Sequence, residues 1–67
     1  MRTDLIKARK KAGLTQQQLA KAMGVYQSAI SKYESGELAV TPMRAKKMAS
    51  VLDIDVLAIL YPKPQRT

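Results

Sequence analysis

The sequence predicts an all-helical fold built from five short helices. Glycine and proline residues divide the chain into five stretches of helix-forming composition, and these breaks are Gly13, Gly24, Gly36, Pro42 and Pro62. At 67 residues the chain has room for one small domain, because a chain of this size buries only about 60% of the surface that its unfolded form exposes. We expect residues 1–61 to form this domain and residues 62–67 to form a disordered tail, and a deep active site is not expected.

The first helix is predicted to end at Gly13, a residue that suits the left-handed conformation found after many helices. The apolar residues before it recur at the spacing of one helix face, and they are Leu5, Ala8 and Ala12. We expect Thr3 or Asp4 to cap the start of this helix.

The second and third helices are joined by a tight turn at Gly24. Thr15, followed three residues later by Gln18, forms a capping box, which predicts a helix that begins at Gln16. Its inner face consists of Leu19, Ala20 and Met23. The third helix is predicted over about residues 27–35. Its inward residues are Ile30 and Tyr33, and its outward residues are Gln27, Ser28, Ser31 and Lys32.

The fourth and fifth helices have clear start signals. Thr41 as the cap and Pro42 at the first helical position predict the start of the fourth helix. Its apolar stripe consists of Ala45, Met48, Ala49 and Leu52. A fifth, short helix is predicted at Asp55, where Ile54 and Ile59 are placed to pack across the helix start.

The composition favours a polyanionic partner and argues against an enzyme. Lys and Arg number 12 against 5 Asp and Glu, a net charge of +7, which attracts nucleic acid but also anionic membranes and acidic proteins. His and Cys are absent, so the commonest catalytic bases, nucleophiles and zinc ligands are missing. No metal or cofactor site is predicted. The lack of Cys and of a signal-like apolar start makes a cytoplasmic protein the expected case.

The second and third helices match the geometry of a helix-turn-helix. In such a unit the second helix enters the major groove of DNA while the first braces it on the backbone. Ala20 is small enough for the two helices to cross closely, Gly24 can adopt a positive φ, and Ile30 fills the gap between them. The outward residues of the third helix then remain available to contact bases.

Three segments at fixed spacing carry a resemblance to a known family. They are Gly-Leu-Thr-Gln-Gln-Gln-Leu-Ala at 13–20, Met-Gly-Val at 23–25 and Ile-Ser-Lys-Tyr-Glu-Ser-Gly at 30–36. Over roughly residues 4 to 60 the chain resembles the Cro and phage-repressor family of helix-turn-helix regulators, also called the xenobiotic-response-element type. The resemblance implies a compact, five-helix, lambda-repressor-like domain that binds DNA sequence-specifically.

The resemblance also implies a role for individual residues. Gln16 matches a position that bonds a DNA phosphate and braces the first recognition residue, Gln27. Base contacts are implied for Gln27, Ser28, Ser31 and Lys32. Phosphate contacts are expected for Gln16, Gln17, Tyr26, Ser35 and Arg44. Arg9 and Glu34 match positions that form an ion pair between the first and third helices. Without the motif, all of these residues would be interpreted as solvated helix surface.

The sequence departs from the family pattern at two places. Tyr26 stands where a Ser or Thr usually caps the recognition helix, and its ring lies either against a thymine methyl or sugar of the DNA or back on the domain. The loop after the third helix usually carries basic residues but here contains Leu38, Ala39 and Val40. Its phosphate contacts are then expected from elsewhere, and the candidates are Ser35, Arg44, Lys46 and Lys47.

The predicted function is that of a transcriptional repressor that binds a palindromic operator in double-stranded DNA as a homodimer. The apolar surplus near the end of the chain favours a dimer seam of Leu57, Leu60 and Tyr61, with Val56 and Ile59 completing the core. The alternative is an antitoxin that masks a toxin protein and represses its own operon. Binding to a membrane surface is disfavoured, because the apolar face of the basic first helix is narrow.

Overall fold

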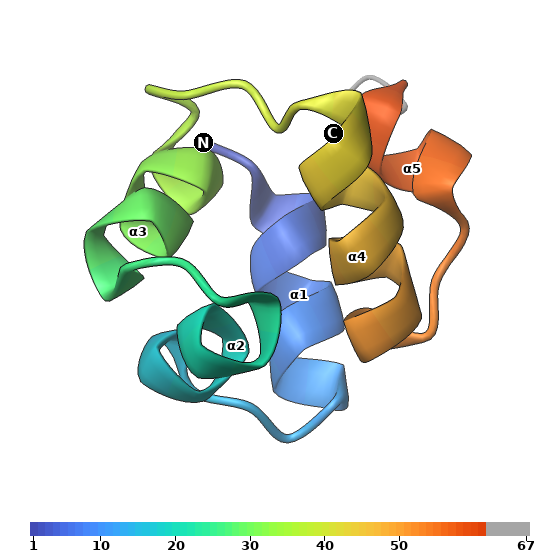
Figure 1. Cartoon of the computed structure of the whole chain (residues 1–67). Coiled ribbons are helices and arrows are strands. Elements are labelled where there is room, and N and C mark those ends of the chain that lie inside the picture. The colour runs from blue at the N-terminus through green and yellow to red at the C-terminus, as the bar shows by residue number, and fades with distance from the viewer. Residues whose placement is uncertain (62–67) are drawn as a thin grey trace.

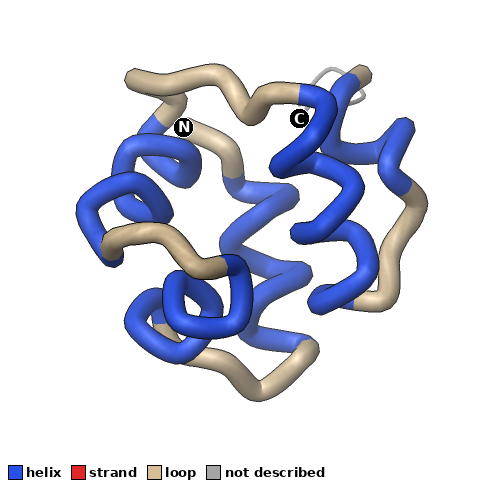
Figure 2. The backbone as a smooth tube through the Cα atoms, viewed as in Figure 1, coloured by secondary structure: helices blue, strands red, loops and turns tan. Residues whose placement is uncertain are grey.

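The computed structural model describes residues 1–61 and contains, within that range, five α-helices and no strand (Figures 1 and 2). The helices are α1 (Thr3–Lys11), α2 (Gln16–Met23), α3 (Gln27–Ser35), α4 (Pro42–Leu52) and α5 (Val56–Leu60). The predicted fold class and the predicted order of the helices are therefore confirmed. The tail predicted to be disordered, residues 62–67, lies outside the described residues.

Three of the five helices begin at the side-chain caps that the sequence predicts. Thr15 Oγ1 accepts a hydrogen bond from the backbone N–H of Gln18 at 3.1 Å, and the Gln18 side chain accepts one from the backbone N–H of Thr15 at 2.9 Å. Thr41 and Asp55 cap α4 and α5 with their side-chain oxygens. Each cap satisfies an amide that the first helical turn leaves without an acceptor, which fixes where the helix starts.

The start of α1 differs from the prediction, whereas its end agrees with it, because Gly13 follows the helix with a φ of +75°. Arg2 is the N-cap and makes no capping bond with its side chain, whereas Thr3 and Asp4 lie inside the first turn. The Asp4 carboxylate instead accepts two hydrogen bonds from the Arg2 guanidinium, at 3.0 and 2.8 Å. Ala12 follows the last residue of α1 and is exposed, so it is not part of the buried face. Asp4 does not cap α1 because its carboxylate hydrogen-bonds the Arg2 guanidinium and not a backbone N–H of the first turn.

Left-handed residues end α2 and α4. Gly24 has a φ of +71°, as the predicted tight turn requires. Asp53 ends α4 with a φ of +55°, although it is not a glycine. Asp is among the few residues that adopt this conformation at modest cost, and the break between α4 and α5 carries no Gly or Pro that would mark it in the sequence.

The core is formed by one buried face from every helix. Its buried apolar residues are Leu5, Leu19, Ala20, Met23, Ile30, Tyr33, Val40, Ala45, Met48, Ala49, Leu52 and Ile59. Val40 belongs to the loop before α4, yet only 8% of it is exposed, so part of this loop anchors the core. In Figure 1, α1 lies behind and between the α2–α3 pair and the α4–α5 pair. This arrangement leaves α3 at one side of the molecule.

Candidate nucleic-acid interface

The crossing of α2 and α3 is tight because small and fully buried residues meet between them. Ala20 and Ile30 are 3% and 0% exposed. The backbone N–H of Val25 donates to the carbonyl of Ala20 at 3.0 Å, which closes the turn after Gly24. The interior of the pair is thus fully packed, and α3 is held rigidly with its outer face turned away from the core.

The outer face of α3 carries every residue that was expected to contact bases. Gln27, Ser28, Ser31 and Lys32 are all exposed. Tyr26, the N-cap, makes no capping bond with its side chain, and the backbone N–H groups of Gln27 and Ser28 have no acceptor within residues 1–61. The helix start therefore presents both side-chain and backbone donors to an approaching partner, and its dipole favours negative charge there.

A buried carboxylate joins three helices below this face. Glu34 of α3 is 5% exposed and accepts from Arg9 Nε of α1 at 2.6 Å, forming the ion pair that the family resemblance implies. Arg9 also donates to the Leu14 carbonyl at 2.8 Å, and Gln16 Nε2 of α2 donates to Glu34 at 2.9 Å. Because its charge is fully hydrogen-bonded, Glu34 fixes the orientation of α3 against α1 and α2.

The position of Gln16 differs in one respect from what the resemblance implies. Its side-chain nitrogen bonds Glu34, and it makes no hydrogen bond to Gln27. Gln16 and the exposed Gln17 form the first turn of α2, and their backbone N–H groups have no acceptor in the described part of the chain. This turn has the donors and the dipole orientation that suit a phosphate.

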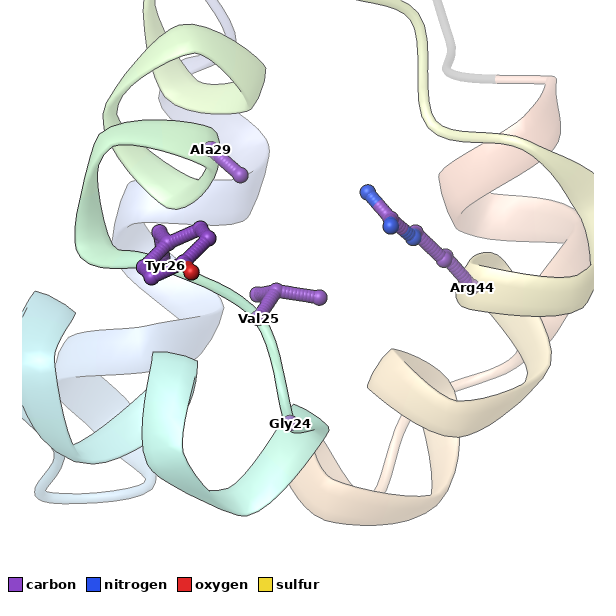
Figure 3. A pocket seen from close by; sticks show the side chains of 5 residues that line it. All are labelled: Gly24, Val25, Tyr26, Ala29 and Arg44. Carbon is purple, nitrogen blue, oxygen red and sulfur yellow. The ribbon is translucent and has the colours of Figure 1, made fainter.

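Tyr26 precedes α3 and Tyr33 lies within it, and the two side chains have opposite environments. Tyr26 is 84% exposed, so its ring does not pack back on the domain. Tyr33 is 1% exposed, and its hydroxyl accepts a hydrogen bond from Arg44 Nη1 of α4 at 2.7 Å. Figure 3 shows Arg44 reaching from α4 across an opening whose other wall is formed by Val25, Tyr26 and Ala29. The first turn of α4 thus places a cation beside α3.

The other residues expected to contact phosphates lie at the surface. The Ser35 hydroxyl donates to the Lys32 carbonyl at 3.1 Å and accepts from the backbone N–H of Glu37 at 3.3 Å, so it shapes the end of α3. Lys46 and Lys47 are exposed on α4. No residue of the loop that follows α3, at positions 36–41, adds a basic side chain.

The residues expected to form a dimer seam lie on α5 and at its C-cap, and α5 is on the opposite side of the molecule from α3 (Figure 1). Leu57 and Tyr61 are 55% and 75% exposed, whereas Leu60 is half-buried and packs against the core. Ile59 is buried and Val56 is half-buried. Within residues 1–61, no helix has the length and apolar character needed to cross a bilayer.

Comparison with known proteins agrees with this geometry. A helix-turn-helix family model of the Cro and phage-repressor type matches residues 5–59. The chain belongs to this helix-turn-helix family. Searches of curated proteins and of solved structures gave no match. The helix-turn-helix protein is therefore a DNA-binding transcriptional regulator with a lambda-repressor-like fold.

Proposed function

We propose that this regulator is a sequence-specific repressor that reads the major groove of its operator with α3. The observation that carries the proposal is the exposure of four polar residues on the outer face of a helix whose inner face is fully packed. These residues are Gln27, Ser28, Ser31 and Lys32. A glutamine amide can bond adenine through two hydrogen bonds, and a lysine can donate to the acceptors of guanine.

Contacts to the DNA backbone set the register of α3 in the groove. We assign them to the first turn of α2, to Arg44, to Tyr26 and to Ser35. Such contacts carry no sequence information themselves but supply most of the affinity and make it dependent on salt. The net charge of +7 strengthens this attraction.

A homodimer is the functional unit of the proposal. One recognition helix reads only a few base pairs, whereas two helices placed about one helical turn apart read a palindrome. The exposed side chains of Leu57 and Tyr61 are an apolar surface that a second copy would cover. An antitoxin would use the same surface for a toxin protein, and a small toxin gene beside the gene for this chain would favour that alternative.

The test is selection of bound fragments from random-sequence DNA, followed by transcription from a promoter that overlaps the selected site. We expect an inverted repeat whose half-sites lie about 10 base pairs apart, and we expect transcription to fall as the protein is added. Ser50→Ala, at an exposed position of α4, is the control for variants of the α3 face and should bind the selected DNA as the wild type does. Recovery of DNA without a shared motif would exclude sequence-specific recognition, and increased transcription would identify an activator.

A further inference from the structure

The opening between the start of α3 and the start of α4 is a pocket, and none of the four residues proposed to contact bases lines it. Its volume is about 420 Å³, within the range of pockets that hold small ligands (about 300–1,000 Å³). It is lined by Gly24, Val25, Tyr26, Ala29 and Arg44. One wall is thus formed by Val25, Tyr26 and Ala29, of which Tyr26 has a largely exposed side chain, and the other wall is formed by the Arg44 guanidinium (Figure 3).

The guanidinium is held in place by the recognition helix itself. Arg44 Nη1 donates to the Tyr33 hydroxyl at 2.7 Å. The Tyr33 ring is fully packed, so the hydroxyl is a fixed point on α3. Arg44 forms no ion pair within residues 1–61, and its remaining N–H groups have no acceptor there. A planar guanidinium with one bond to a fixed hydroxyl and several donors left over is oriented to donate two hydrogen bonds to an anionic group such as phosphate.

We propose that this pocket binds one sugar–phosphate unit of the operator backbone, and that Tyr33 positions Arg44 through its hydroxyl group. The guanidinium binds the phosphate, and the Tyr26 ring covers the attached deoxyribose. This inference rests on the proposed function, since it requires that α3 faces DNA. It adds that Tyr33, a buried residue that does not contact DNA itself, raises the affinity for DNA through Arg44. Its hydroxyl accepts a hydrogen bond from the Arg44 guanidinium and so holds this cation in a fixed position relative to α3.

The experiment is a double-mutant cycle with Tyr33→Phe and Arg44→Gln, measured on a labelled duplex selected from random DNA and on a scrambled duplex of the same length. We expect Arg44→Gln to weaken binding about tenfold on both duplexes and to reduce the slope of log K against log salt by about 0.9. Tyr33→Phe should weaken binding about fivefold when Arg44 is present, but by less than about twofold in the Arg44→Gln background.

This cycle separates positioning from folding. A merely structural role for the hydroxyl would weaken binding equally with and without Arg44, and that result would overturn the inference. Thermal melts of each variant establish that binding is measured on folded protein. Loss of affinity for Arg44→Gln without coupling to Tyr33→Phe would leave the proposed function intact and refute the positioning role alone. If the wild type bound neither duplex, the proposed function and the inference would fail together.

The place of the Tyr26 ring is tested separately. Tyr26→Ala should weaken binding about fivefold without changing the salt slope, because the ring is uncharged. Replacing the thymines of the selected duplex by uracils should leave wild-type affinity within about twofold, since the deoxyribose is unchanged. A loss on the uracil duplex as large as that of Tyr26→Ala would place the ring on a thymine methyl and contradict the proposed contact with the deoxyribose.

Discussion

Replacing Arg9 by Met should destabilise the helix-turn-helix protein severely, because it strands the Glu34 carboxylate. The Glu34 side chain is 6% exposed and the Arg9 side chain 11%. With Arg9 gone, only the neutral amide of Gln16 remains as a side-chain donor to the buried charge. The Leu14 carbonyl also loses the donor that Arg9 supplies. The cost is therefore that of an uncompensated charge and not of one lost contact.

The expected magnitude is about 3–5 kcal/mol, the range measured when one partner of a buried ion pair is removed. A domain of 67 residues has a total stability of about 3–10 kcal/mol at the usual value per residue. Arg9→Met should therefore leave the protein close to unfolding at room temperature. The double variant Arg9→Met/Glu34→Leu removes both charges and should regain at least about 2 kcal/mol, because apolar side chains of similar size often replace a buried pair without loss.

The assay is urea denaturation followed by circular dichroism. Asp4→Asn is the matched control, since the Arg2–Asp4 pair is more exposed, at 21% and 30% of the two side chains. An exposed pair contributes only about 0–1 kcal/mol. If the double variant proved as unstable as Arg9→Met, the lost free energy of unfolding would come from the packing of the Arg9 side chain. An unpaired Glu34 carboxylate would then not be the cause.

Three further predictions follow from the caps, the surface and the titratable groups. Tyr26 is an exposed N-cap whose side chain makes no capping bond. Tyr26→Ser should therefore raise the free energy of unfolding by about 1 kcal/mol and the melting temperature by about 4–8 °C. An unchanged melting temperature would show that the serine hydroxyl does not form a capping bond. Leu57→Glu, at a side chain that is 55% exposed, should leave the melting temperature unchanged and shift sedimentation toward the monomer, and an unaltered dimer would exclude the α5 seam. The Arg2 guanidinium hydrogen-bonds Asp4 and holds the pKa of that carboxyl below its ordinary value of 3.8. The difference in free energy of unfolding between wild type and Asp4→Asn should therefore be fully present above pH 3.8 and should disappear as the pH falls through the lowered pKa of the folded state. A difference that persisted at acid pH would contradict the pairing.

Local signals in the sequence predicted most of the helix boundaries. The capping box of Thr15 and Gln18, the Thr41–Pro42 start and the left-handed Gly24 each act within a few residues, so no knowledge of the fold is needed to interpret them. The signal that failed was the N-cap of α1. Asp4 is a good capping residue in isolation, but it lies beside Arg2, whose guanidinium bonds the carboxylate more strongly than a backbone amide does.

Contacts between distant residues were harder to predict. The Arg44–Tyr33 hydrogen bond joins α4 to α3, and neither residue has a local pattern that marks the other. The buried Val40 lies in a segment without periodicity, which a sequence pattern assigns only to a loop. The Arg9–Glu34 pair was expected only through the family resemblance, because the spacing of two charges in a sequence does not establish that they meet.

The central claim is that α3 reads bases through its outer face, and Gln27→Ala tests it most directly. Wild type and variant should be compared by selection from the same random-sequence DNA, with Ser50→Ala as the control. We expect Gln27→Ala to lose about 1–3 kcal/mol of binding free energy on the wild-type operator and to relax the base preference at one position of each half-site. An equal loss on every DNA, with the preferred sequence unchanged, would show that Gln27 does not read a base and would contradict the account.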